Sequence, residues 1–285
     1  MILDFHTHIF PDRLAHQAVG KLAKKAGIKN YTDGTAASLL ESMERAQVTH
    51  SVQCSIVVKP GQEQKINAFA LSLLERWKRG EKPCIIPFAG VHPRSPDWRR
   101  WLGWIKEQGF PGVKLHPNYQ QFYIDDPEVR DFYREAFRLG LVLLFHAGYD
   151  DGLPVPDYAS VERSANVLPL LEEGRVVLAH MGDYTRPEAA LRLLAGRGVY
   201  LDTSLSLFCT EKDLLGQIFR KHTAERILFA TDCPWSDQAA AVKHLREDFG
   251  DLFGEADLQK IYWENGAKLL GLEPSLIVDR HGPQA

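Results

Sequence analysis

Two histidines stand one residue apart near the start of the chain, in the stretch DFHTH at residues 4–8. Side chains alternate across a β-strand, so His6 and His8 would project to the same side together with Asp4. Two imidazoles at one site are a common beginning of a metal centre. A polar strand end with two partly exposed histidines would give the same pattern, and this stretch alone does not decide between them.

Ionisable side chains also stand where later apolar runs of the chain end. They are His92, Lys114 with His116, His146, His180 and Asp232. Neutral imidazole and carboxylate are the usual ligands of zinc and related divalent ions, and a catalytic site needs three or four of them plus a position open to water. One such set is formed by His6, His8, His146 and Asp232. Metal binding would lower the pKa of a bound water from about 15.7 toward about 7, which provides hydroxide at neutral pH.

Short apolar runs, many of them rich in β-branched residues, recur along the chain and predict the strands. They lie at 2–6, 50–58, 84–91, 112–116, 141–146, 176–180, 199–204 and 227–232. Several are almost continuously apolar, which is typical of strands buried on both faces of a parallel sheet. Segments with helical spacing lie between them, at 67–80, 127–140, 165–174, 187–198 and 211–222.

This alternation predicts an α/β fold, a single (β/α)8 TIM barrel that forms one domain over residues 1–285, although an open doubly wound sheet would share it. The carboxyl ends of barrel strands form one rim, so the ionisable residues above would meet there. The stretch 11–49 is longer than one crossover needs and predicts an extra loop or helix over the barrel mouth. The helix predicted at 258–272 would pack outside, after the last strand.

Composition narrows the class of partner. The chain has 34 basic and 37 acidic residues, a formal net charge of −3, and no basic stripe that would indicate nucleic acid or an anionic membrane. We therefore expect a small-molecule substrate, and leave a homo-oligomer open. The cysteines are scattered without a Cys-x-x-Cys pair, and the N-terminus enters the first predicted strand without a signal segment, so a cytoplasmic location is expected.

Taken in order, these residues resemble the amidohydrolase superfamily, in particular the amidohydrolase-related branch that also contains metal-dependent decarboxylases. The segments that carry the resemblance are DFHTH (4–8), GVKLHP (112–117), FHAG (145–148), AHMG (179–182), ATDCPW (230–235) and ENGAKLLGL (264–272). The resemblance covers nearly the whole chain. It implies that the metal ligands are His6, His8, His146 and Asp232. It also implies that His180 either binds a second metal or acts on the substrate.

The resemblance implies a metal-dependent hydrolase in which metal-activated water attacks an amide, lactone or ester carbonyl. Asp232 would take the proton, and His180 would stabilise the oxyanion or protonate the leaving group. The alternative is a non-oxidative decarboxylase of a small aromatic or unsaturated carboxylic acid that uses the same residues. The expected ion is zinc, with manganese or iron as alternatives. A non-catalytic metal-binding protein is disfavoured, because both proposed proton-handling residues are present.

Lys114 decides between one metal and two. Binuclear members of the superfamily use a carboxylated lysine near this strand end as a bridging ligand, so a second metal at Lys114 is the alternative. His116 departs from that arrangement, and an unmodified Lys114 beside it would instead bind a substrate carboxylate or phosphate, so one metal is favoured. The remaining substrate-binding candidates are Arg94, Tyr119 and Trp235 on rim loops. Asp183 and Asp202 would hydrogen-bond a liganding histidine or serve as caps.

Overall fold

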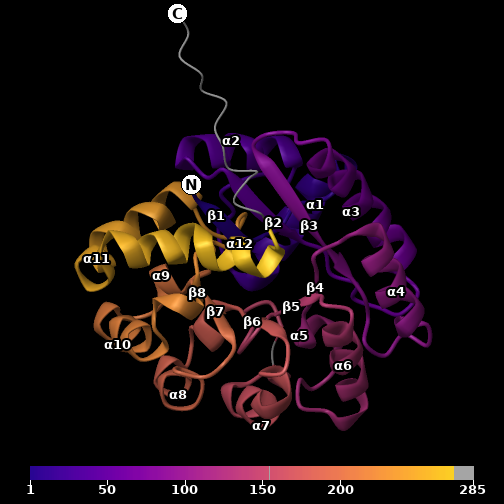
Figure 1. Ribbon diagram of the computed structural model, residues 1–285. Coiled ribbons are helices and arrows are strands. Elements are labelled where there is room, and N and C mark those ends of the chain that lie inside the picture. Colours follow the sequence, from indigo (N-terminus) through magenta and orange to yellow (C-terminus); the bar gives the residue numbers. More distant parts are fainter. Residues whose placement is uncertain (154, 273–285) are drawn as a thin grey trace, which may run out of the picture.

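The computed structural model describes residues 1–153 and 155–272. Its strands form one parallel sheet of eight strands, in which spatial neighbours follow the order of the chain. The strands are β1 (Leu3–Thr7), β2 (His50–Cys54), β3 (Cys84–Gly90), β4 (Gly112–Leu115), β5 (Val142–Phe145), β6 (Arg175–Leu178), β7 (Tyr200–Asp202) and β8 (Ile227–Leu228). Figure 1 shows the strands in the middle of the molecule with helices around them.

Backbone contacts beyond β8 close the seam between the last strand and the first. The amide of Phe5 donates to the carbonyl of Phe229 at 2.9 Å, and Thr7 forms a parallel bridge with Cys233. The sheet is therefore a nearly closed barrel. The prediction of an α/β TIM barrel is confirmed.

Helices separate the successive strands and cover the outside of the barrel. They are α1 (Asp12–Ala26), α2 (Ala36–Ala46), α3 (Glu63–Lys78), α4 (Trp98–Gln108), α5 (Pro117–Gln120), α6 (Arg130–Arg138), α7 (Val161–Leu171), α8 (Pro187–Leu193), α9 (Ser206–Cys209), α10 (Lys212–His222), α11 (Gln238–Gln259) and α12 (Asn265–Leu270). The long stretch 11–49 thus holds two helices, α1 and α2. No helix in the described part of the chain is both long and apolar enough to cross a membrane.

Successive side chains along a strand belong alternately to two hydrophobic clusters. In β5, Leu143 and Phe145 pack in the larger cluster, which they share with the surrounding helices. Val142 and Leu144 belong to a smaller cluster that residues of the other strands complete. His146 follows in the same alternation as Val142 and Leu144, so the pleat turns it toward the barrel interior. Ala267 and Leu269 of α12 join the smaller cluster, which places the C-terminal helix against the barrel as expected.

Candidate metal centre and cavity

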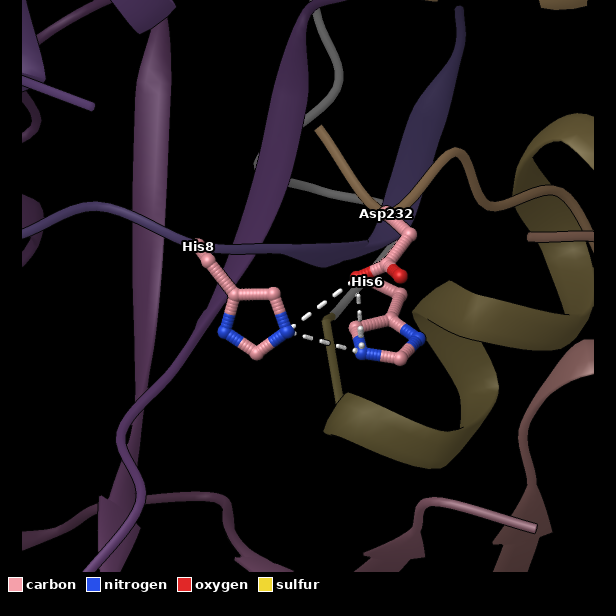
Figure 2. A group of neighbouring side chains, drawn as sticks. All are labelled: His6, His8 and Asp232. Carbon is pink, nitrogen blue, oxygen red and sulfur yellow. Dashed lines mark hydrogen bonds and ion pairs between the residues drawn. The ribbon is translucent and has the colours of Figure 1, made fainter. Parts of the chain in front are cut away.

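His6, His8 and Asp232 come together at the seam of the barrel, as Figure 2 shows. The Nε2 atoms of His6 and His8 are 3.2 Å apart. Oδ1 of Asp232 lies 3.4 Å from Nε2 of His6 and 3.1 Å from Nε2 of His8. The three residues come from the first strand and from the segment after the last one, so closure of the barrel is what brings them together.

The second ring nitrogen of each histidine faces an acceptor that fixes its tautomer. Nδ1 of His6 lies 3.1 Å from Oδ2 of Asp202, and Nδ1 of His8 lies 3.1 Å from the carbonyl oxygen of Cys54. Carboxylate and carbonyl oxygens only accept, so both Nδ1 atoms carry the proton and both Nε2 atoms present lone pairs. Two nitrogen lone pairs and a carboxylate oxygen therefore face one another, which is the donor set of a divalent metal.

Asp232 is ionised in this setting. Burial alone would raise the pKa of its carboxyl, but His6 and the contact with His8 lower that pKa to about 2, so a positive partner here, either a protonated ring or a bound cation, keeps the carboxylate ionised. Its Oδ1 atom is buried and has no hydrogen-bond partner among the described residues. A buried, unpartnered carboxylate oxygen is costly unless a cation or donor joins it, so this atom fits a metal ligand.

Asp4 connects the two segments that carry these ligands. Its carboxylate accepts hydrogen bonds from the amides of His6 and Thr231 at 3.2 and 3.0 Å, and from Nε2 of Gln238 at 2.7 Å. Thr231 precedes Asp232, whose φ of 65° turns the backbone sharply after β8. Burial raises the pKa of Asp4 to about 7, against the opposing effect of its hydrogen bonds.

His146 and His180 form a second pair beside the first group. Nδ1 of His180 faces the carbonyl oxygen of Ser204 at 3.2 Å, so it carries the proton and leaves Nε2 as an acceptor. That Nε2 lies 3.1 Å from Nδ1 of His146, which must then donate. The remaining nitrogen, Nε2 of His146, is buried without a hydrogen-bond partner in the described residues. It is the fourth free lone pair, and this fits the predicted role of His146 as a ligand.

His116, His146 and Asp150 also bring their donor atoms within 4.8 Å of one another. The rings of His116 and His146 are stacked, with centroids 4.1 Å apart and planes only 6° from parallel. A metal ion binds an imidazole in the plane of its ring, and one ion cannot lie in two parallel planes that are separated by this distance. This group is therefore not a second metal centre in the observed arrangement. Nε2 of His116 instead contacts Oδ2 of Asp150 at 3.3 Å.

Lys114 is fully buried, and its Nζ lies 2.9 Å from Nε2 of His6. Burial lowers the pKa of its amine below the ordinary value, in opposition to the raising effect of Cys54, Asp232 and Asp202. The amine thus contacts a predicted metal ligand directly and is not exposed to solvent.

A cavity of about 330 Å³ opens beside these residues. The predicted site residues that line it are His6, His8, Lys114, His116, Tyr119, His146, His180, Asp232 and Trp235. Arg94 is not among them, because its guanidinium donates to Asp126 at 2.5 Å and to the carbonyl oxygen of Gln121 at 3.0 Å. Of the two candidate positioning carboxylates, Asp202 contacts His6, whereas Oδ1 of Asp183 accepts from Thr185.

Several cavity residues carry no signal in the sequence. They are Arg13, Lys65, Asp150, Asp151 and Tyr184. Arg13 lies in the long stretch after the first strand, and Lys65 near the start of α3, where charged residues usually mark a solvated helix face. Only the expectation that the stretch 11–49 covers the barrel mouth pointed toward Arg13.

The sequence matches the family model described as Amidohydrolase over residues 3–272. The chain belongs to the amidohydrolase family. No curated protein matches the sequence of this amidohydrolase. Membership and the group formed by His6, His8 and Asp232 together support a divalent metal. His146 as a fourth ligand stays a prediction.

Solved structures share the fold of this amidohydrolase at low sequence identity. The 2,6-dihydroxybenzoate decarboxylase from Rhizobium has a TM-score of 0.69 and 19% identity, over 95% of this chain and 98% of that one. A dihydroxybenzoic acid decarboxylase from Polaromonas sp. JS666, with bound manganese and the inhibitor 2-nitroresorcinol, has a TM-score of 0.68 and 17% identity, over 95% and 97%. A probable 2-pyrone-4,6-dicarboxylic acid hydrolase from Acinetobacter baumannii, with citric acid bound, has a TM-score of 0.63 and 17% identity, over 95% and 99%.

Proposed function

We propose that this amidohydrolase is a metal-dependent hydrolase of a small molecule that carries an amide, lactone or ester carbonyl. The observation that carries the proposal is the donor set: Nε2 of His6, Nε2 of His8 and Oδ1 of Asp232 converge, and Nε2 of His146 is buried without a hydrogen-bond partner in the described residues. When bound, a divalent ion would supply acidified water and polarise the carbonyl. Zinc fits this donor set, and manganese and iron remain alternatives.

Two residues of the chain would move protons. Asp232 is ionised at neutral pH, because its pKa is lowered to about 2 despite burial, so it would accept a proton at Oδ2, the oxygen that is not assigned to the ion. His180, which follows β6, lines the same cavity and would relay the proton taken up by Asp232 to the leaving group. The donor group is not enclosed by protein, since it opens to the cavity, and this supports an enzyme over a structural metal site.

The test is turnover of a panel of lactones, aryl esters and anilides by protein loaded with zinc or manganese. We expect activity that chelation abolishes and metal restores. Asp232→Asn should lower kcat/KM about 10²–10⁴-fold, the usual contribution of a general base. The variant must be compared at equal metal content, because Asp232 is also a proposed ligand. Full activity in a metal-free preparation would overturn the proposal.

Non-oxidative decarboxylation is the second candidate, and two observations favour it. Apolar side chains form most of the cavity wall, as an aromatic acid requires, and Lys114 lies within reach of a bound carboxylate there. Two of the similar structures named above are decarboxylases of dihydroxybenzoic acids. Carbon dioxide release from dihydroxybenzoates, without turnover of any ester or amide, would replace hydrolysis by this activity.

A further inference from the structure

The outer part of the cavity is lined by α1, one of the two helices between β1 and β2, and by the beginning of α3, the helix between β2 and β3. α1 contributes Leu14 and Leu22, and the beginning of α3 contributes Ile66 and Phe69. These apolar side chains form a wall for the body of a ligand. The same two helix starts also place cations in this wall, Arg13 from α1 and Lys65 from α3. Both cations are exposed, whereas His6 and Asp232 are buried, so the cations lie at the mouth and the donor group lies at the floor.

These two cations have no acidic partner among the described residues. Some surface arginines pair with an acid, as Arg163 does with Asp125 at 2.8 Å, and others do not, so it is the position of Arg13 and Lys65 in the cavity wall that distinguishes them. The acids of the cavity wall are already engaged. Asp150 accepts from the amide of Gly152 at 2.8 Å and contacts His116, and Asp151 accepts from the hydroxyl of Tyr184 at 2.6 Å. Asp150 and Asp151 keep their negative charge, but among the described residues neither forms an ion pair with Arg13 or Lys65, so both cations remain available to an anionic group of a ligand.

Fold stability does not account for the position of these charges. Arg13 and Lys65 lie in the first turns of α1 and α3, at the positive end of the helix dipole, where a cation is unfavourable. The cations that suit α1 are Lys24 and Lys25, in its last turn. A positive charge that opposes the helix dipole while facing a cavity is explained by an anionic ligand group in that cavity.

We propose that Arg13 and Lys65 form a subsite at the cavity mouth for an anionic group of the substrate that is remote from the reacting carbon. The substrate is then an amphiphilic acid with an apolar body against α1 and α3, its reacting end toward the donor group and a carboxylate or phosphate at the mouth. This proposal rests on the proposed function only in naming the group that reacts at the metal. The two cations select among acids of this class and take no part in bond breaking.

The test is binding, measured by isothermal titration calorimetry on the metal-loaded protein. The probes are three pairs that exchange a distal methyl group for a carboxylate: 4-methylbenzoate and terephthalate, 4-methylcinnamate and 4-carboxycinnamate, and 4′-methylbiphenyl-4-carboxylate and biphenyl-4,4′-dicarboxylate. Three lengths are used so that one diacid spans the cavity. We expect that diacid to bind about tenfold more tightly than its methyl partner, and the preference to weaken as salt is added.

The double variant Arg13→Gln/Lys65→Gln should reduce this preference to about threefold or less, with the affinity for the methyl partner almost unchanged. Lys21→Gln/Lys24→Gln is the matched control, because it removes the same charge from exposed positions of α1 that do not line the cavity. The control should keep the preference. The subsite is overturned if no diacid is preferred in any pair, or if the preference survives the double variant. Binding is independent of turnover, so an inactive protein that prefers the diacid contradicts the proposed reaction and leaves the subsite supported.

Discussion

Asp202 organises the candidate metal centre although no ligand role is expected for it. Oδ2 contacts Nδ1 of His6 at 3.1 Å, and Oδ1 accepts from the amides of His180 and Ser204 at 2.9 and 3.1 Å. One buried carboxylate thus sets the tautomer of His6 and holds the backbone of His180. Carboxylates that orient liganding histidines in this way raise the basicity of the ligand.

We expect Asp202→Asn to weaken zinc binding about 10–100-fold, because an amide holds the Nδ1 proton of His6 less strongly than a carboxylate does. Competition with a chelating dye measures the affinity. Asp183→Asn is the control, since Oδ1 of Asp183 accepts from Thr185 and from no histidine. Equal affinities in the wild type and in Asp202→Asn would mean that His6 does not need this partner.

A variant of Lys114 distinguishes one bound metal ion from two. The proposed ligands are His6, His8, His146 and Asp232, whereas Lys114 carries an unmodified amine whose Nζ lies 2.9 Å from Nε2 of His6. We therefore expect about one equivalent of metal per chain, retained in Lys114→Met and lost in His6→Ala, by elemental analysis. Two equivalents that fall to one or none in Lys114→Met would show instead that the lysine takes part in a bridged pair of ions.

At the scale of elements, the first position of β4 is packed so closely that only glycine fits there. Gly112 pairs with Val142 of β5, and a Cβ atom at Gly112 would lie 2.6 Å from the carbonyl oxygen of Val142 and 2.6 Å from the ring of Phe88. Gly112→Ala should lower the free energy of unfolding by about 1–3 kcal/mol, the usual cost of overpacking. Urea unfolding measures it.

Gly103 is the matched control for Gly112. It lies inside α4, and a Cβ atom there would meet no atom within 4 Å. Gly103→Ala should raise the free energy of unfolding by about 1 kcal/mol, because alanine favours the helix over glycine. If both variants destabilised the protein equally, the contacts around Gly112 would not be the cause.

The sequence predicts every strand of the barrel but not where each one ends. The apolar run 227–232 gives a strand of only two residues, Ile227–Leu228, because the chain then turns to present Asp232. Apolar residues after β2, such as Ile56 and Val58, line the cavity instead of extending the strand. Apolar character marks burial, and burial at a barrel rim does not require a strand.

The sequence likewise predicts part of the candidate site: the metal-ligand candidates but not the cations of the mouth. Alternation places His6 and His8 on one side, and the strand-end rule brings Asp232 to them. The expectation that Asp4 shares that side is wrong: the register of β1 shifts between Asp4 and Thr7, and Asp4 bonds Gln238 of α11 outside the cavity. The two cations of the mouth do not follow, because Arg13 and Lys65 reach the cavity only through the way α1 and α3 fold over it. Pairing of Arg94 with Asp126 likewise depends on loop positions that no periodicity fixes.

At the scale of the whole molecule, stability in acid depends on buried histidines. His222, at the end of α10, is buried, and burial lowers its pKa to about 4. Its Nδ1 accepts from the amide of Gly196 at 3.1 Å, and its Nε2 donates to the carbonyl oxygen of Arg226 at 3.2 Å. The neutral ring thus ties α10 to the segments before β7 and β8, and protonation would remove the acceptor.

The sign of the pH effect follows from the lowered pKa of His222. Between pH 6.5 and 4 the unfolded chain binds this proton and the native protein does not, so the free energy of unfolding falls as the pH is lowered. The loss from this residue approaches about 3 kcal/mol near pH 4.

Urea unfolding of the wild type and of His222→Gln at pH 7, 6, 5 and 4.5 isolates the contribution of His222, because every other titrating group is common to both proteins. Glutamine can keep both hydrogen bonds without titrating, so the free energy of unfolding of the wild type should fall relative to that of the variant as the pH falls. A constant difference across this range would mean that protonation of His222 does not open the barrel in acid.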